Sequence, residues 1–329
     1  MNILVYFAVL AGAFAILAKS ADLFVDSAVG IAETLGVPKM IIGIVLVGFA
    51  TTAPEFAVSV QSAYLGHPEI ALGNGVGSVI CDDGIAMALA AILAPTPILI
   101  DRKILKTAGI FLIFIYIVSY IMALTGTFTR YEGALLVLFL AGYIYFLYVT
   151  TRKERNKASI LKDTFAENES ARGLESSGKS LKRLFIYFLL GLAGVIISSR
   201  LIIWSCIYIA GYFKLPEIII GLTVIAIGTS IPEIGTCIVA ARKGEGEIAA
   251  GNIIGADILN ILWIVGVSAM VNPMDVSKKI INFMFPWMFL IVGTMLIAMR
   301  IRYRIGKPKG VILSSLYAIY IVMTLRYFL

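Results

Sequence analysis

Long apolar stretches separated by short polar loops run along almost the whole chain. Predominantly apolar runs such as residues 110–124, 135–149 and 281–299 approach the ~20 residues that a helix needs to cross a lipid bilayer. This pattern predicts membrane-spanning helices. We expect ten spans, over residues 3–25, 37–64, 70–95, 104–126, 131–151, 182–212, 215–242, 247–271, 279–300 and 309–328.

A hydrophilic segment divides the ten expected spans into two groups of five. Between Arg152 and Arg183 the chain holds nine Lys or Arg and five Asp or Glu among Ser, Asn and Gly, a composition typical of a hydrated linker. We therefore expect a first five-helix repeat over residues 1–151, a linker over 152–181 and a second five-helix repeat over 182–329.

The two groups of helices repeat the same sequence pattern. When the chain is shifted by 178 residues, the halves align without a gap. The matched pairs include Pro38 with Pro216, Thr51 with Thr229, Pro54 with Pro232, Glu55 with Glu233, and Asn74 with Asn252. Because each half has an odd number of helices, the second half enters the membrane from the opposite side. The sequence therefore predicts an all-α membrane protein of two inverted repeats, which is typical of secondary transporters with a binding site near the midplane.

Composition agrees with a membrane protein and excludes an ordinary soluble domain. Of the 329 residues, 60% are apolar and 14% are charged, and the mean hydropathy is +0.96. The three cysteines lie in apolar segments without CxxC spacing, which indicates packing residues and neither a disulfide framework nor a zinc site.

The formal charge of +7 raises the question of an anionic partner such as nucleic acid. The basic residues, however, concentrate in loops on one side of the expected helices, as the positive-inside rule describes. We therefore expect a multi-pass protein of the cell membrane with a cytoplasmic linker and both termini extracellular. Its expected partners are the lipid bilayer and inorganic cations, not nucleic acid, and the sequence assigns no oligomeric state.

The first repeated motif places a hydroxyl, a proline and a carboxylate in the middle of an expected span. It reads Ala-Thr-Thr-Ala-Pro-Glu over residues 50–55 and Gly-Thr-Ser-Ile-Pro-Glu over residues 228–233. A proline in a helix leaves the carbonyl four residues earlier without its N–H partner. In each half a threonine lies four residues before the glutamate, so we expect the two side chains of one half on the same helical face. Hydroxyl, carbonyl and carboxylate oxygens suit a hard cation such as Ca²⁺.

The second repeated motif is rich in glycine, with GNGVGSVICD over residues 73–82 and GNIIGADILN over residues 251–260. No strand precedes either run, so a nucleotide-binding fingerprint is excluded by context. The glycines instead predict close helix contacts, which bring polar groups of the third and eighth spans against the glutamates.

Several acidic residues lie deep within the expected spans, where each ionised group costs about 2.5–3.5 kcal/mol. They are Glu55, Asp82, Asp83, Glu233 and Asp257. Lys19 and Arg200 are the only basic residues well away from the span ends, too few to neutralise five acids as ion pairs. We interpret Glu55, Glu233 and Asp82 as cation ligands. Asp83 either caps a neighbouring backbone or is protonated, and Asp257 either binds the cation or lines its pathway.

At these residues the sequence resembles the cation/Ca²⁺ exchanger superfamily, and specifically its prokaryotic sodium/calcium exchangers. Repeats of that family carry G-T-S-x-P-E followed by G-N-x-x-G-S and a polar residue four positions later, and the resemblance covers both halves. It implies a cation site made by Thr51, Glu55, Ser78, Asp82, Thr229, Glu233, Asn260 and the backbone carbonyls of Gly48 and Ala226. Within that set it implies Ca²⁺ ligation by Thr51, Glu55, Thr229 and Glu233, and Na⁺ or Ca²⁺ ligation by Asp82.

The chain departs from the family pattern at two kinds of position. Ala50 and Thr52 replace the first glycine and the serine of the first motif, and Ala256 replaces a serine of the second repeat, which removes one potential Na⁺ ligand. Compared with the archaeal-type pattern, the aspartate and asparagine at positions 82 and 260 are exchanged between the halves.

These residues and the resemblance together predict a secondary antiporter that exchanges Ca²⁺ for Na⁺ across the membrane by alternating access. A Ca²⁺/H⁺ exchanger is the alternative, in which the glutamates exchange a proton for the metal. A cation channel is less well supported, because a selectivity filter normally needs a symmetric ring of subunits. The chain has no HExxH or GxSxG motif, so we expect neither enzymatic activity nor a cofactor besides the transported ions.

The expected topology makes a labelling prediction. Cysteines introduced at Gly173 in the linker and at Lys278 should react with a membrane-impermeant maleimide from opposite sides, Gly173 from the cytoplasm, because basic residues mark the inner face. The parent chain is the control, since its own cysteines lie in apolar spans. Labelling of both introduced cysteines from the same side would contradict the inverted topology.

Overall fold

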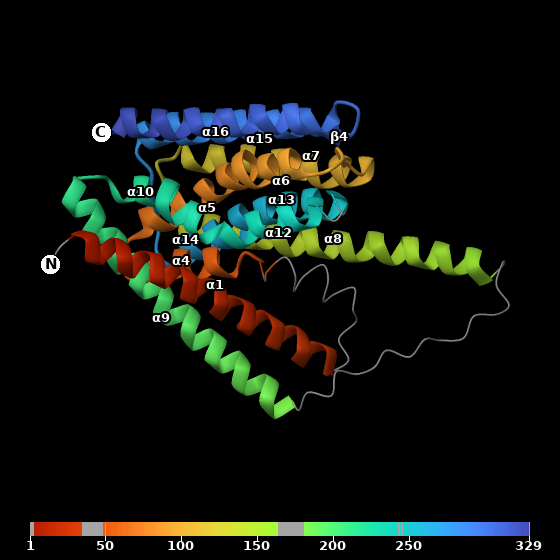
Figure 1. The fold of residues 1–329 in the computed structure, drawn as a ribbon, viewed down its shortest axis with the longest axis horizontal. Helices are drawn as coiled ribbons and strands as arrows, with labels where there is room; N and C mark the ends of the chain where they lie inside the picture. The colour runs from red at the N-terminus through yellow and green to blue at the C-terminus, as the bar shows by residue number, and fades with distance from the viewer. Residues whose placement is uncertain are drawn as a thin grey trace.

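The computed structural model describes residues 3–34, 49, 51–163, 181–242, 244 and 246–328. Over this part the chain is almost entirely helical, with four strands of two residues each. Figure 1 shows the long helices running side by side, with α1 and α9 as a pair along one edge and α15 and α16 along the opposite edge.

The helices follow one another in the same order in both halves. The first half contains α1 (Ile3–Thr34), α4 (Ala53–Tyr64), α5 (Pro68–Cys81), η2 (Asp82–Ala86), α6 (Met87–Leu93), β1 (Ile98–Leu99), α7 (Arg102–Ala123), β2 (Thr127–Phe128) and α8 (Arg130–Asp163). The second half contains α9 (Leu181–Phe213), α10 (Glu217–Ile220), η3 (Gly221–Ile225), α11 (Ala226–Thr229), α12 (Ile231–Arg242), α13 (Gly246–Leu259), η4 (Asn260–Val265), α14 (Gly266–Val271), β3 (Met274–Asp275), α15 (Lys278–Arg300), β4 (Arg304–Ile305) and α16 (Lys307–Phe328). The segments labelled η are single π-helical turns within longer helices.

The number of membrane-spanning helices can be counted only over the described residues. Eight helices there are long and apolar enough to cross a membrane, and the count is nine if the bent pair of segments Glu217–Thr229 and Ile231–Arg242 forms one span. Ten spans were expected from the sequence. The expected span over residues 37–64 falls partly on residues 35–48 and 50, which lie outside the described residues.

Two helices continue well beyond the ends that hydropathy predicts. Helix α1 extends to Thr34, where residue 25 was expected to end the span, and α8 extends to Asp163, inside the segment assigned to the linker. The sequence of α8 after Thr151 holds three Lys and two Arg with one each of Glu, Ala and Leu, and it contains neither Gly nor Pro. Its helix propensity is therefore favourable although its hydropathy is low. Hydropathy locates the end of a membrane span, but propensity decides where the helix itself ends.

Short strand pairs connect loops of the two halves. Ile98 of β1 pairs with Ile305 of β4, and Thr127 of β2 pairs with Asp275 of β3, both antiparallel. The hydrogen bonds fix the loops of α7 and α8 against those of α15 and α16. Two-residue strands carry no periodic pattern, and the sequence alone did not predict them.

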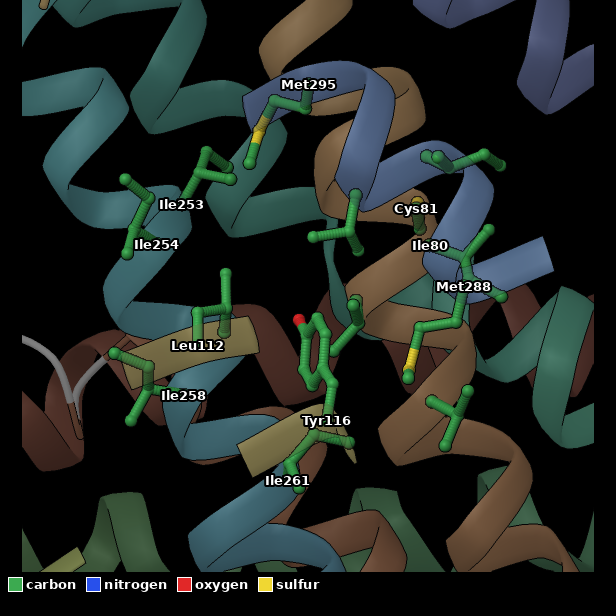
Figure 2. Close-up of a cluster of buried hydrophobic side chains, with 14 of the residues drawn as sticks. Ile80, Cys81, Leu112, Tyr116, Ile253, Ile254, Ile258, Ile261, Met288 and Met295 are labelled. Carbon is green, nitrogen blue, oxygen red and sulfur yellow. The ribbon is translucent and has the colours of Figure 1, made fainter. Parts of the chain in front are cut away.

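The interior of the bundle is built around α5 and α13. Every residue of α5 from Ile70 to Cys81 is buried. Figure 2 shows isoleucines of α13, Leu112 and Tyr116 of α7, and Ile80 and Cys81 of α5 around a common interior. The free cysteines Cys81, Cys206 and Cys237 are all buried, as expected for packing residues.

Helices α1 and α9, the first helices of the two halves, pack against each other along the edge of the bundle (Figure 1). Tyr6 stacks on Tyr208 with a centroid separation of 4.8 Å, and Phe24 contacts Phe188 at 4.7 Å. Among the described residues, their contacts with the inner helices are far fewer than their contacts with each other. The two helices thus form an outer pair, which shares one apolar cluster with the inner bundle through residues such as Leu17 of α1 and Val58 of α4.

Glycine allows two backbones to touch in the middle of the inner bundle. A Cβ atom on Gly73 of α5 would lie 2.6 Å from the Ile218 carbonyl oxygen and 3.1 Å from the Gly221 Cα, and one on Gly221 would lie 2.7 Å from the Ile70 carbonyl oxygen. Real side chains do not approach backbone this closely. The close contact that the glycine-rich motif predicts is therefore confirmed at Gly73.

We expect Gly73→Ala to destabilise the protein by about 1–3 kcal/mol, because overpacking against backbone atoms cannot be relieved by a side-chain rotation. Thermal unfolding in detergent measures the effect. Gly142→Ala on α8 is the matched control, since its Cβ would meet no described atom within 4 Å. Equal losses of melting temperature in the two variants would contradict the proposed backbone contact.

Candidate cation-binding site

Each half interrupts a helix at its first motif. Helix α11 ends at Thr229 and α12 begins at Ile231, with a bend of 43° between the two segments. In the first half Thr52 has φ −88° and ψ 7°, and α4 begins directly after it. Pro54 and Pro232 are thus second residues of new helices, where their missing N–H is tolerated. The sequence predicted each proline within one continuous helix. In the structure, a new helix begins directly before each proline.

The break places each glutamate next to the other half's hydroxyls. Glu55 lies beside Thr229 and Ser230, and Glu233 lies beside Thr51. The sequence placed each threonine beside the glutamate of its own half, because residues four apart in a helix share a face. The contacts with the other half were not predicted. The contact of each threonine with the glutamate of its own half stays a prediction.

The two glutamates are buried without any compensating group. Glu55 and Glu233 are each 1% exposed, and none of their four carboxylate oxygens has a hydrogen-bond partner among the residues that the structure describes. Within the described residues no Lys or Arg forms a salt bridge with either. A buried unpaired carboxylate is costly, whereas a bound cation supplies the missing charge.

Asn74 connects the two halves at this point. Its Nδ2 donates to the Glu55 carbonyl oxygen at 3.2 Å and to Ser59 Oγ at 2.9 Å, and its Oδ1 accepts from Thr229 Oγ1 at 3.1 Å. The side chain is fully buried. Asn74 therefore fixes α4 of the first half relative to α11 of the second. Sequence reasoning missed this role, as it missed Ser59 and Ser230, although an asparagine repeated in a buried span was an available signal.

Asp82 and Asn260, related by the 178-residue shift, face each other. Asn260 Nδ2 donates to Asp82 Oδ2 at 3.4 Å, and both residues are buried at the first position of a π-helical turn. Ser230 lies beside Asp82 as well as beside Glu55. In the described parts of the chain, Asp82 Oδ1, Asn260 Oδ1 and Ser78 Oγ have no hydrogen-bond partner. π-Helical turns are frequent at functional sites.

The remaining predicted ligands differ in what the structure describes of them. The Ala226 carbonyl oxygen lies at the bend and accepts from Ser230 N at 3.1 Å and from Thr229 Oγ1 at 3.4 Å. Gly48 lies outside the described residues. Within the described residues, no three His, Cys, Asp or Glu side chains form a ready metal cluster. A cation here would therefore draw on hydroxyl, amide and carbonyl oxygens in addition to carboxylates, as hard cations do.

Comparison with known proteins gives a consistent result. The chain matches the family described as sodium/calcium exchanger protein over residues 5–149 and 183–326. It is 30% identical over 348 residues to the sodium/calcium exchanger MaX1 of Methanosarcina acetivorans, covering 98% of this chain and 99% of that protein. It is 29% identical over 309 residues to the inner membrane protein YrbG of Escherichia coli K12, covering 92% of each. A solved structure of the sodium-calcium exchanger NCX_Mj has the same fold, with a TM-score of 0.63 at 24% identity over 97% of this chain and 98% of that one.

The contact between Asp82 and Asn260 generates a charge-exchange prediction. We expect Asp82→Asn to weaken Ca²⁺ binding about ten- to hundredfold, because losing an interaction with a buried charged group costs about 1.5–3 kcal/mol. Adding Asn260→Asp moves the carboxylate across the same contact and should recover much of the affinity. Calcium titrations of the parent and both variants by calorimetry provide the comparison.

Asp275→Asn is the matched control, since it removes an exposed carboxylate in β3. It should bind Ca²⁺ like the parent. Asp82 would not be a shared ligand if its single variant bound like the parent, or if the double variant bound no better than the single one.

Proposed function

The chain belongs to the sodium/calcium exchanger protein family, and on that premise we propose that it exchanges Ca²⁺ for Na⁺ across the membrane as a secondary antiporter. The observation that carries this proposal is the crossed arrangement of Glu55 and Glu233. Two buried carboxylates from opposite halves converge with no cationic side chain among the described residues to neutralise them. A transported cation is the natural counter-charge.

The charge of the site favours competition between the two ions. One Ca²⁺ neutralises the pair of glutamates, and Na⁺ neutralises them only when more than one ion binds. Both are hard cations that prefer oxygen ligands, so both use the same carboxylates, hydroxyls and carbonyls. Because the ions share ligands, one must leave before the other binds. Shared ligands couple the two movements and give exchange rather than independent leakage.

Alternating access needs two parts of the molecule that can move against each other. We propose that the outer pair of α1 and α9 moves against the inner bundle, which holds Glu55, Glu233 and Asp82, and so opens the site to each side in turn. The far weaker contact of the outer pair with the inner bundle supports this division. The Gly73–Gly221 contact supports an inner bundle that moves as one body.

We propose ten spans in two inverted halves, over residues 1–151 and 182–329, with the linker in the cytoplasm. The strand pairs support this arrangement. β1 and β4 lie in loops that the ten-span order puts on the cytoplasmic side, and β2 and β3 lie in loops that it puts outside. If the bent pair Glu217–Thr229 and Ile231–Arg242 did not cross the membrane as one span, the number of spans between the members of each strand pair would be odd, and they would lie on opposite sides.

We expect Glu55→Gln and Glu233→Gln each to reduce Ca²⁺ exchange to the level of empty vesicles, because each removes one of the paired charges of the site. Glutamine keeps the size of the side chain, so the variants should still insert and fold. Na⁺-dependent ⁴⁵Ca²⁺ uptake by reconstituted protein measures exchange. Glu132→Gln is the control, since that carboxylate is exposed and accepts hydrogen bonds from Thr129 at the start of α8.

The same vesicles identify the counter-ion. Uptake driven by an outward Na⁺ gradient at equal pH supports Na⁺ exchange, whereas uptake driven only by a pH gradient supports Ca²⁺/H⁺ exchange. Normal exchange by either glutamine variant would contradict the assignment of the site. Flux that does not saturate and needs no counter-ion would contradict the antiporter itself.

A further inference from the structure

We propose that Asp83, Asp257 and the Tyr116 hydroxyl form a second binding site for a divalent cation, adjacent to the site around Glu55 and Glu233. The inference rests on the proposed function, which supplies a protein that takes Ca²⁺ into its interior. It concerns residues that the crossed glutamate arrangement does not use.

The three side chains come from elements that pack together in the inner bundle. Asp83 is the second residue of η2, Asp257 lies in α13, and Tyr116 lies in the middle of α7. Helix α13 contacts both η2 and α7. In Figure 2, Tyr116 projects between the α13 ribbon that carries Ile254 and Ile258 and the α5 ribbon that leads into η2.

Asp83 and Asp257 are not explained by the internal repeat. The 178-residue shift places Asp83 on Ile261 and Asp257 on Val79, so each half contributes one acid at a position where the other half is apolar. The two acids nevertheless meet, with their carboxyl groups within hydrogen-bonding reach of each other. The pair of Asp83 and Asp257 is therefore distinct from the predicted ligands that the repeat relates to each other, such as Glu55 and Glu233.

The oxygens of this group lack partners. Asp83 and Asp257 are fully buried and Tyr116 is 1% exposed. Within the part of the chain that the structure describes, neither the four carboxylate oxygens nor the tyrosine Oη forms a hydrogen bond. The Tyr116 hydroxyl is close enough to interact electrostatically with Asp257 and Asp83. Apart from one another, these five buried oxygens have no partner among the described residues, which is uncommon for polar groups in folded proteins.

The negative charge of the pair also lacks a counter-charge. Ionised carboxylates are acceptors only, so two of them in contact require a positive group between them. Within the described residues neither forms a salt bridge. Tyr116 of the same group lies near the buried apolar side chains of Leu112 and Ile261, and an apolar interior screens charge poorly (Figure 2). One shared proton would leave a full negative charge in this interior, whereas one divalent cation neutralises both carboxylates.

Asp82 connects the proposed second site with the first. It interacts electrostatically with Glu55 and Glu233 on one side and with Asp83 and Asp257 on the other. A cation held by Asp83 and Asp257 would therefore reduce the negative potential at Asp82. Occupancy of the second site should lower the affinity of the first, because both attract cations through the same carboxylate.

The test removes the first site and measures what binding remains. Full-length protein in detergent, in choline buffer without Na⁺, is dialysed against ⁴⁵Ca²⁺. The variants are Glu55→Gln with Glu233→Gln, and the same pair combined with Asp83→Asn and Asp257→Asn. A control combines the glutamine pair with Asp22→Asn and Asp26→Asn, two exposed aspartates of α1. Size-exclusion elution and thermal unfolding verify that each variant is folded.

We expect the variant with Glu55→Gln and Glu233→Gln to retain Ca²⁺ binding. Adding Asp83→Asn and Asp257→Asn should weaken that binding at least about tenfold. Adding the two α1 substitutions instead should leave it unchanged. Tyr116→Phe in the glutamine background removes only the hydroxyl and should weaken residual binding severalfold, which keeps the test valid if the quadruple variant fails to fold. Absence of residual binding in a folded glutamine pair, when the parent binds Ca²⁺, would overturn the second site and indicate a shared proton. Residual binding that is insensitive to Asp83 and Asp257 would overturn it equally.

The outcome is separable from that of the proposed function. If Glu55→Gln and Glu233→Gln left exchange intact, the first site would fail as proposed. A fall in bound Ca²⁺ on substituting Asp83 and Asp257 would still support the second site.

Discussion

The structure depends on negative charge placed where water cannot reach it. Glu55, Glu233 and Asp82 are all about 1% exposed, with no basic side chain among the described residues to pair with them. A membrane protein can hold such groups only if its surroundings are polar at that point or if cations come and go. The helix breaks, the asparagine between the halves and the π-helical turns all bring oxygens to this region. The breaks and the π-helical turns do so by interrupting the regular α-helical hydrogen bonds at these positions.

The crossed pairing of glutamates and threonines changes how the repeat should be understood. A duplicated motif suggests two similar sites, one in each half, but the geometry gives one region that both halves complete. Asn74 illustrates the same point, because its hydrogen bonds reach the Glu55 carbonyl in its own half and Thr229 in the other. The two halves of the repeat therefore contribute side chains to one buried region.

Much of this was predictable from the sequence, and the reason is the repeat. Glu55 and Glu233, the meeting of Asp82 with Asn260, and the close approach at Gly73 follow from motifs that recur at one fixed spacing in spans of strong apolar character. The contacts between each glutamate and the hydroxyls of the other half did not follow, because residue periodicity relates positions within one helix and does not say which helix of the other half lies beside it. The end of α8 and the paired two-residue strands depend on helix propensity and tertiary contacts that hydropathy does not register.

The contact between Asp82 and Asn260 bears on the origin of such a chain. An ancestral half that worked alone would have needed a second copy inserted in the opposite orientation to complete the crossed ligands. In that homodimer, position 82 would have met its own counterpart, so the contact would have joined two identical side chains. The present pair joins a carboxylate to an amide at 3.4 Å. Once the two positions differ, neither half can replace the other, and joining them in one polypeptide guarantees one copy of each.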